Sequence, residues 1–347
     1  MREFPVAAED APTPWKTGLL DQLAVDRPEL RMRLRAGLEQ TEKLLLATTG
    51  DAADPRIAEA AGHLARAGGK RLRPLLVLLG AEFGEPWWAG VTEAAVVAEL
   101  VHIASLHHDD VMDRAPTRHG VPSVHARFGT RTSVFSGDWL LARGARLAAD
   151  LSPAAFRLHA ATADRLVEGQ LLELAGPAEG EDEVGHYFRV LSGKTAALLS
   201  MSLGIGALQA GVPEQYVAAL TGFGEELGCA FQIADDLLDL RSSAGTSGKE
   251  RGTDLLAGVT TLPVLLALAG EHPQDAELRE LLAAGPVPEA SATRALELFA
   301  RSPALAESEA ALHRRLDLAR AALDALPEQP ARRALLSLCD YVAVRSS

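Results

Sequence analysis

Cysteine and aromatic residues are both scarce in this sequence. The 347 residues include two cysteines, Cys229 and Cys339, which are far apart and show no spacing typical of metal ligands. Neither a disulfide framework nor a structural zinc site is indicated, and a reducing, cytoplasmic location is expected. Aromatic residues amount to only 5% of the chain, so few bulky rings are available to close an internal cavity.

Basic residues are outnumbered by acidic ones. The chain has 34 Lys and Arg against 47 Asp and Glu, which gives a formal net charge of −13. This balance argues against nucleic-acid binding, which usually needs a basic face. An anionic substrate would therefore need a local group of basic residues. The 48% of hydrophobic residues is typical of a globular protein with a core.

Signals for export and for membrane insertion are weak. Acidic residues precede any apolar run at the amino terminus, which is the wrong order for a secretory signal. Two uncharged stretches, 195–213 and 255–270, approach the length of a membrane span. Polar residues, glycines and a proline interrupt them, so we interpret both as interior helices and expect no transmembrane span.

Strand signals are almost absent. Apolar residues recur at helical spacing, and proline and glycine separate segments of roughly 15 to 25 residues. No composition change divides the chain, because the loops are short and the apolar helices on either side need each other for burial. We predict an all-α fold in which residues 21–347 form a single large helical bundle, preceded by a flexible segment at 1–20.

Two acidic motifs share one pattern. Each follows an apolar helical run and reads Asp-Asp-x-x-Asp: Asp109, Asp110 and Asp113 in the first, and Asp235, Asp236 and Asp239 in the second. On a helix, the three carboxylates of each motif lie within an arc of about 100°. Such crowded like charges repel unless water or cations separate them. Oxygen ligands without Cys, in two copies, indicate Mg²⁺ shared with substrate phosphates.

Basic residues lie beside glycines or beside these motifs. Gly68–Pro74 carries three positive charges, Arg118 and His119 follow the first motif, Lys194 lies in Gly-Lys-Thr, and Lys249 lies in a glycine-rich stretch after the second motif. Each alone is typical of an exposed charge. Together they favour a site that binds phosphate groups.

Taken in order, these motifs resemble those of the trans-polyprenyl diphosphate synthases. The resemblance runs from about Gly68 to Pro263 and includes Gly-Gly-Lys-Arg-x-Arg-Pro, both aspartate motifs, Gly-Lys-Thr and a final Thr-Leu-Pro. It implies a helical bundle of the isoprenoid synthase type around a deep central cavity. It also implies a magnesium-dependent prenyltransferase, with three ions when substrate is bound, that condenses isopentenyl diphosphate with an allylic diphosphate. A homodimer is implied as well.

The resemblance assigns roles to particular residues. Metal binding falls to Asp109, Asp113, Asp235 and Asp239, with Asp110 and Asp236 nearby in the catalytic group. Arg118, Lys194 and Lys249 would hold the allylic diphosphate, and Lys70, Arg73, His102 and residue 119 the isopentenyl diphosphate. The Thr195 hydroxyl and the Gln232 amide would steady the allylic carbocation.

The sequence departs from the family at two positions, and a third feature bears on product length. His119 replaces an Arg that helps bind isopentenyl diphosphate, and Val259 replaces a frequent Lys. Ala104 and Ser105, just before the first motif, are small where members that stop at fifteen carbons have aromatic residues. We therefore expect an all-trans product of thirty carbons or more, with geranylgeranyl diphosphate as the alternative.

Three other functions remain open at this stage. A terpene cyclase on the same scaffold would use the aspartates and Mg²⁺ but would need no isopentenyl diphosphate site. A non-catalytic subunit of a heteromeric synthase could lose its aspartates, whereas this chain keeps all six. A membrane-spanning protein would depend only on the two uncharged stretches. Peripheral membrane contact during product release is compatible with the main interpretation.

Overall fold

The computed structural model describes residues 18–23, 25, 27–241 and 251–345, and this part of the chain is almost entirely helical. The first half contains α1 Gly18–Gln22, α2 Pro28–Gly50, α3 Pro55–Ala61, α4 His63–Ala67, α5 Leu72–Ala81, α6 Val91–Met112, α7 Val124–Phe128, α8 Thr130–Ala149 and α9 Pro153–Ala175. Between α6 and α7, β1 Thr117–Arg118 and β2 Val121–Pro122 form an antiparallel hairpin.

The second half continues without strands in its described residues. It contains α10 Glu183–Leu191, the π-helical turn η1 Ser192–Ala196, α11 Ala197–Gln209, α12 Glu214–Arg241, α13 Thr253–Ala257, α14 Leu262–Ala269, η2 Pro273–Asp275, α15 Ala276–Ala283, α16 Glu289–Phe299, α17 Pro303–Ala322, η3 Leu323–Ala325 and α18 Pro330–Arg345. The predicted all-α class is confirmed.

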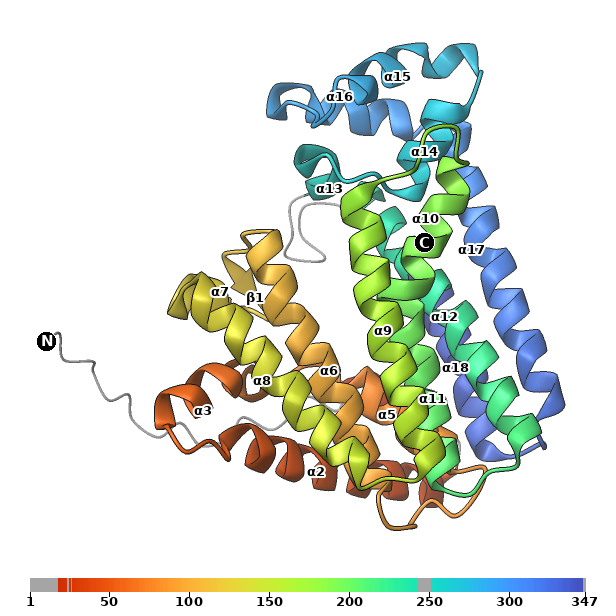
Figure 1. Ribbon diagram of the computed structural model, residues 1–347. Helices are drawn as coiled ribbons and strands as arrows, with labels where there is room; N and C mark the ends of the chain where they lie inside the picture. The colour runs from red at the N-terminus through yellow and green to blue at the C-terminus, as the bar shows by residue number, and fades with distance from the viewer. Residues whose placement is uncertain (1–17, 24, 26, 242–250, 346–347) are drawn as a thin grey trace, which may run out of the picture.

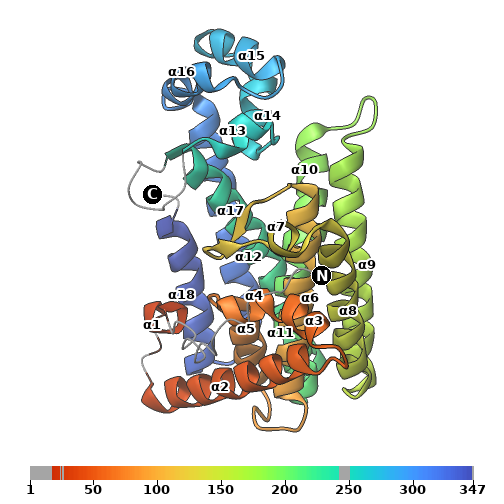
Figure 2. The same ribbon diagram turned by 90° about the vertical axis from the view of Figure 1, so that its left-hand side faces the viewer.

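Helix α11 is the centre of the bundle. It contacts α5, α6, α9 and α12, and Figure 1 shows α9, α11, α12 and α17 side by side, with α6 and α8 on one flank. Helices α13 to α16 lie at one end of the molecule and α2 crosses the other end, as both views show (Figures 1 and 2). The first aspartate motif ends α6 and the second lies near the end of α12.

Glycines bring the helices around α11 into close contact. A Cβ atom on Gly206 would lie 2.0 Å from the carbonyl oxygen of Val77 in α5. On the opposite side, a Cβ on Gly224 of α12 would lie 2.6 Å from the Cα of Ser200. Real Cβ atoms do not approach so closely, so these positions need glycine and hold the backbones together.

The core consists of three apolar clusters. The largest draws residues from α1 to α18. A second, which we call the α6–α11 cluster, joins helices α5, α6, α8, α9 and α11 through Val77, Ala94, Ala95, Val97, Ala98, Val101, Ala148, Leu151, Ala155, Leu198, Met201 and Ile205. A third surrounds Leu100, Ile103 and Ala104 on the other face of α6.

The uncharged stretches lie inside the bundle. Within the described residues, Glu183–Gln209 is the one helical segment long and apolar enough to cross a membrane, and 83% of its most apolar window is buried inside the protein. Burial of Leu262, Val264 and Leu265 places much of the second stretch in the core as well. Interior helices account for both stretches, as expected.

One boundary expected from the sequence is wrong. Residues 1–17 lie outside the described residues, but Gly18–Leu20 belong to helix α1. Leu19 and Leu20 are only 4% and 2% exposed and pack in the largest cluster. Because their burial fixes them to the core, the expected flexible segment does not include residues 18–20.

Candidate active site

The first aspartate motif lies on the last turn of α6. The backbone N–H of Asp113 donates to the carbonyl of Asp109 at 2.8 Å, and Asp113 caps the helix. Asp109 is half-buried and Asp113 is exposed, so solvent can reach both carboxylates. These two are on nearly the same side of the helix, four residues apart.

Asp110 points another way and is fully buried. Its Oδ1 atom accepts hydrogen bonds from Nε and Nη2 of Arg118 at 2.8 and 2.7 Å. The pair ties the β1–β2 hairpin to α6. The Oδ2 atom of Asp110 is buried and accepts no hydrogen bond from the described residues. Asp110 and Arg118, predicted as separate members of the site, are thus direct partners.

Asp109 lies in an environment that disfavours its negative charge. Burial raises the pKa of its carboxyl, nearby Lys194 partly offsets that effect, and Asp113 adds repulsion. Glu173 of α9 repels it as well. Because carboxylates crowd here and supply oxygen donors alone, a divalent cation suits the site.

The middle aspartate of the second motif is also buried, but neutral groups hold it. Asp236 accepts hydrogen bonds from the Tyr187 hydroxyl at 2.7 Å, the Gln232 amide at 3.1 Å and the Leu262 backbone N–H at 3.3 Å. Burial raises its pKa, and the three hydrogen bonds oppose that effect. Asp236 therefore joins α12 to α10 and α14.

Asp239 caps a neighbouring helix. Its Oδ1 accepts from the Thr253 backbone N–H at 3.1 Å and from the Thr253 hydroxyl at 2.6 Å, and its Oδ2 accepts from the Asp254 N–H at 3.1 Å. Asp235 is half-buried on the same helix. Among the described residues, no three His, Cys, Asp or Glu side chains are already gathered as a metal site.

The Gly-Lys-Thr motif forms the π-helical turn η1. Lys194 Nζ contacts Glu173 at 2.5 Å, and the Thr195 hydroxyl donates to the Gln232 side-chain oxygen at 3.3 Å. A Cβ on Gly193 would lie 2.7 Å from the Cα of Gly169, so the turn crosses α9 at backbone contact. Thr195 and Gln232, predicted together from the resemblance, do lie together.

A second group of basic residues surrounds the start of α5. Arg73 is deeply placed, and burial lowers its pKa to about 10. Its Nε is buried and donates to none of the described residues. Lys70 Nζ lies 3.3 Å from the Tyr341 hydroxyl. Burial, reinforced by Arg73 and His119, moves the pKa of His102 well below its usual value, so His102 is neutral at pH 7.

Arg71 was counted in sequence only as one of the charges in its loop, but it holds the loop in place. Its guanidinium pairs with Glu42 and Glu99, each at 2.8 Å, and donates to the Ala65 carbonyl at 2.7 Å. Its φ of 48° is left-handed. Glu99, an acid inside the apolar run of α6, is the feature of the sequence that could have indicated a buried cation.

His119 lies at the tip of the β1–β2 hairpin. Its φ is 53° and that of Gly120 is 80°, the combination of a two-residue turn with both central residues left-handed. A Cβ on Gly69 would be 3.7 Å from His119 Cε1, so the tip approaches the Gly-Gly-Lys-Arg loop. Burial and the charge of Arg118 lower the pKa of His119, which is therefore neutral at pH 7.

The structure describes only some of the remaining expected site residues. Lys249 lies outside the described residues. Ser105 is partly buried, and its hydroxyl donates to the His102 carbonyl at 2.9 Å. Ala104 is completely buried in the third cluster, beside Leu100 and Leu140. Glu173 and Tyr187, which bind Lys194 and Asp236, had no recognisable motif in the sequence.

The bundle, with two oxygen-donor motifs at the ends of helices and basic residues between them, defines an isoprenoid synthase. Within this class the chain belongs to the polyprenyl synthetase family, whose model matches residues 54–299.

Two of the similar proteins are synthases of long prenyl diphosphates. The chain is 42% identical to a nonaprenyl diphosphate synthase of Mycobacterium tuberculosis over 314 residues, which cover 90% of this chain and 93% of the relative. It is 39% identical to heptaprenyl diphosphate synthase component 2 of Geobacillus stearothermophilus, covering 83% and 90%. The chain is a prenyltransferase of this family.

A solved structure agrees with the fold. The geranylgeranyl pyrophosphate synthase of Corynebacterium glutamicum, complexed with calcium and isoprenyl diphosphate, has a TM-score of 0.83 and 38% identity. The match covers 92% of this chain and 98% of that one. A divalent cation is thus bound in a related structure.

Proposed function

We propose that this chain adds isopentenyl diphosphate head to tail to an allylic prenyl diphosphate and makes an all-trans product of thirty or more carbons, releasing pyrophosphate. One observation carries the proposal. The η1 turn links the two aspartate motifs, because Lys194 lies within electrostatic range of Asp109 while its neighbour Thr195 bonds Gln232 on the helix of the second motif. A diphosphate at this turn would meet both motifs and Lys194.

The metal in this proposal is Mg²⁺, with three ions when substrate is bound. Asp109, Asp113, Asp235 and Asp239 would hold it. Bound Mg²⁺ would neutralise charge that develops on the departing diphosphate. The donors are all carboxylate oxygens, and the buried Oδ2 of Asp110 leaves an acceptor beside the site. Asp239 would bind metal while its oxygens also accept from Thr253 and Asp254.

Two separate groups of basic side chains would bind the two diphosphates. Lys194, Arg118 and Lys249 would hold the allylic diphosphate, and Lys194 must then leave Glu173. Lys70, Arg73, His102 and His119 would hold the isopentenyl diphosphate. The buried Nε of Arg73 supports this, since a desolvated guanidinium N–H needs an acceptor and a diphosphate supplies one.

The hydroxyl of Thr195 and the amide of Gln232 would steady the allylic cation. Thr195 donates its hydrogen to Gln232, so its lone pairs remain available to face positive charge. Asp236 positions Gln232 by accepting from its amide nitrogen. The α6–α11 cluster next to this turn is apolar, and it would keep water from the cation.

Product length is the finer part of the proposal. Pure protein would be incubated with labelled isopentenyl diphosphate and geranyl, farnesyl or geranylgeranyl diphosphate, and the products would be sized. We expect thirty carbons or more, and a shorter product from Ser105→Phe. Ala104, which the sequence placed along the product path, packs instead in the third cluster on the other face of α6. A twenty-carbon product would favour the geranylgeranyl alternative. Product without consumption of isopentenyl diphosphate would favour a cyclase.

The chain would act as a homodimer without a second component. Phe135 on α8 and Val167, Leu171 and Leu174 on α9 are all at least 59% exposed, and the last three share one face at helical spacing. An exposed apolar stripe of this kind fits a second copy of the chain. The component 2 relative raises a heteromeric alternative, which inactivity of the pure chain would support.

The location proposed for the protein is the cytoplasm, with peripheral membrane contact when product leaves. The acidic net charge of −13 supports small anionic substrates held by local basic groups and gives no support to nucleic-acid binding. Cell fractionation would test this location, since a membrane-spanning protein would need detergent for extraction.

A further inference from the structure

On α6 the α6–α11 cluster runs from Val101 to Ala94, toward the end of the bundle opposite the aspartates. On α6, Ala94, Ala98 and Val101 line it, on the helix face that continues through Ser105 to Asp109. On α11, Leu198, Met201 and Ile205 line it, starting just after the η1 turn. An isoprenoid chain that grows from the diphosphate end would follow this apolar layer between the two helices.

A polar bridge closes the far end of the layer. Gln209 is the last residue of α11, and its amide nitrogen donates to the Ala89 carbonyl at 2.8 Å. Its amide oxygen accepts from the Ser152 backbone N–H at 3.1 Å. One side chain therefore joins the end of α11 to the α5–α6 loop and to the α8–α9 loop, next to Leu151 of the cluster.

The α5–α6 loop is fitted to this bridge. Gly90 has a φ of 93°, and a Cβ there would lie 2.4 Å from the amide nitrogen of Gln209 and 3.2 Å from Leu151. The Glu85 N–H donates to the Ala210 carbonyl at 2.9 Å. A Cβ on Gly211 would lie 3.3 Å from the Trp88 ring, so the loop covers the end of α11.

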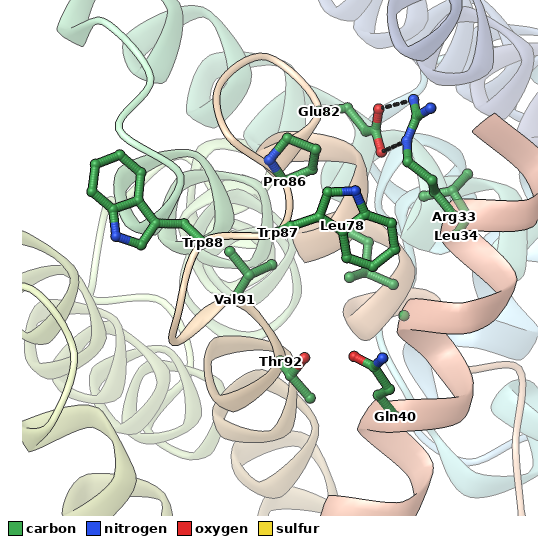
Figure 3. A pocket seen from close by; sticks show the side chains of 11 residues that line it. Arg33, Leu34, Gln40, Leu78, Glu82, Pro86, Trp87, Trp88, Val91 and Thr92 are labelled. Atoms are coloured by element: carbon green, nitrogen blue, oxygen red, sulfur yellow. Dashed lines mark hydrogen bonds and ion pairs between the residues drawn. The ribbon is translucent and has the colours of Figure 1, made fainter. Parts of the chain in front are cut away.

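The outer side of the same loop is apolar and exposed. Trp87 and Trp88 are 61% and 57% exposed. Figure 3 shows Trp87 above Leu78, in a pocket between α2 and the loop, with Trp88 turned to the other side. In Figures 1 and 2 the loop lies at the end of the bundle opposite α13–α16. A chain that passed Gln209 would emerge among these rings.

The length of the layer can be compared with that of a product. From Thr195 to Gln209 the helix rises by about 21 Å, and from Asp109 to Gly90 by about 28 Å. One trans isoprene unit, four bonds long, extends about 5 Å. A chain of about four to six units, or roughly twenty to thirty carbons, would span this distance. Longer chains reach the Gln209 bridge.

We propose that Gln209 is a residue that sets product length, because the bridge it makes to Ala89 and Ser152 ends the apolar path. The inference rests on the proposed function. A growing chain that meets the amide must either stop or displace two hydrogen bonds in order to continue under the α5–α6 loop. Removing the amide lets the chain extend, whereas the reaction at the diphosphate end is unaffected.

The test compares products of the wild type, Gln209→Ala and Gln209→Met with farnesyl diphosphate as starter. Met has about the volume of Gln but cannot make the two hydrogen bonds, so the Met variant provides the test if the Ala variant folds poorly. We expect both variants to shift the main product by at least one isoprene unit toward longer chains. The rate of the first condensation should change less than about twofold, because the site is about 20 Å away.

Gln274→Ala is the matched control, since Gln274 also donates its amide to a backbone carbonyl, that of Arg301, at the other end of the bundle. It should leave product length unchanged. Unchanged lengths in both Gln209 variants, with first condensation intact, would overturn the inference, as would a wild-type product shorter than twenty carbons. A wild type that consumes no isopentenyl diphosphate would instead refute the proposed function.

Discussion

Asp110 and Asp236 have the same place in two identical motifs and both are buried, but their partners differ. A guanidinium holds Asp110 through two contacts, whereas a phenol, an amide and a backbone N–H hold Asp236. The first therefore fastens a hairpin to α6 by charge, and the second fastens α10 and α14 to α12 by neutral donors. The middle aspartate of each motif is a structural anchor, whereas the outer aspartates are the ones proposed to bind metal.

The third aspartates differ as well. Asp113 is exposed at the end of a helix, whereas Asp239 lies within α12 and caps α13. If Asp239 moved toward a cation, its hydrogen bonds to Thr253 and Asp254 would therefore break or α13 would shift with it. Among the described residues, the first motif has no such attachment through its third aspartate.

The largest effect should come from the outer aspartates. Asp109→Ala or Asp235→Ala is expected to lower turnover by at least about 100-fold, since each removes a proposed metal ligand. Steady-state kinetics with saturating Mg²⁺ would measure it. Glu214→Ala, which removes an exposed carboxylate from the other end of α12, is the control and should retain activity. Full wild-type activity in excess chelator would contradict the prediction.

The two anchors should differ in salt dependence. Double-mutant cycles of Asp110→Asn with Arg118→Gln, and of Asp236→Asn with Tyr187→Phe, should each give a coupling of about 1–3 kcal/mol in urea unfolding without metal. Arg118 is 29% exposed, so 1 M NaCl should lower the coupling energy of the first cycle. The coupling energy of Asp236 with the buried Tyr187 should stay unchanged. Equal salt sensitivity in both cycles would remove the distinction between the anchors.

His119→Arg tests the hairpin that follows the first motif. A charged guanidinium in place of a neutral imidazole should lower the Michaelis constant for isopentenyl diphosphate by roughly 3- to 10-fold. The Michaelis constant for the allylic substrate should remain nearly unchanged. His119→Asn, which suits the left-handed turn but carries no charge, should give no such gain. Equal gains for both substrates would argue against two separate diphosphate positions.

The smallest expected effect is a difference in stability between variants of the two third aspartates. Asp239→Ala should lower the free energy of unfolding by about 1–2 kcal/mol, because it leaves the start of α13 without its cap. Asp113→Ala should change it by no more than about 0.5 kcal/mol, since the side chain is exposed. Urea unfolding of metal-free protein would measure both. Equal losses would show that the contact of Asp239 with α13 contributes no stability.

Much of this could be predicted from the sequence because it depends on local spacing. Helical periodicity identified the all-α class, and the resemblance assigned Thr195 and Gln232 to the same part of the site, where the structure shows them in contact. The burial of Asp110 was less visible, although Asp110 is the member of its motif furthest from the other two on the helix surface. Its partner Arg118 could be chosen only when the hairpin was seen.

What could not be predicted depends on contacts between distant segments. The role of Arg71 requires Glu42 and Glu99, which lie on two other helices. The π-helical form of the Gly-Lys-Thr motif accompanies the crossing with Gly169, and nothing in the motif itself marks it. The helix at Gly18–Gln22 was missed because five residues show no periodicity and only tertiary burial holds them.

The glycine contacts of α11 also bear on how such an enzyme can be changed by selection. Gly206, Gly224 and Gly193 set the backbone distances around the layer, and none of them tolerates an added methyl group. Side chains such as Met201 and Ile205 lie between these fixed points and can vary in volume without moving a helix. In a saturation library, substitutions at the glycines should be depleted for loss of fold, while the side chains between them yield folded enzymes with a range of products.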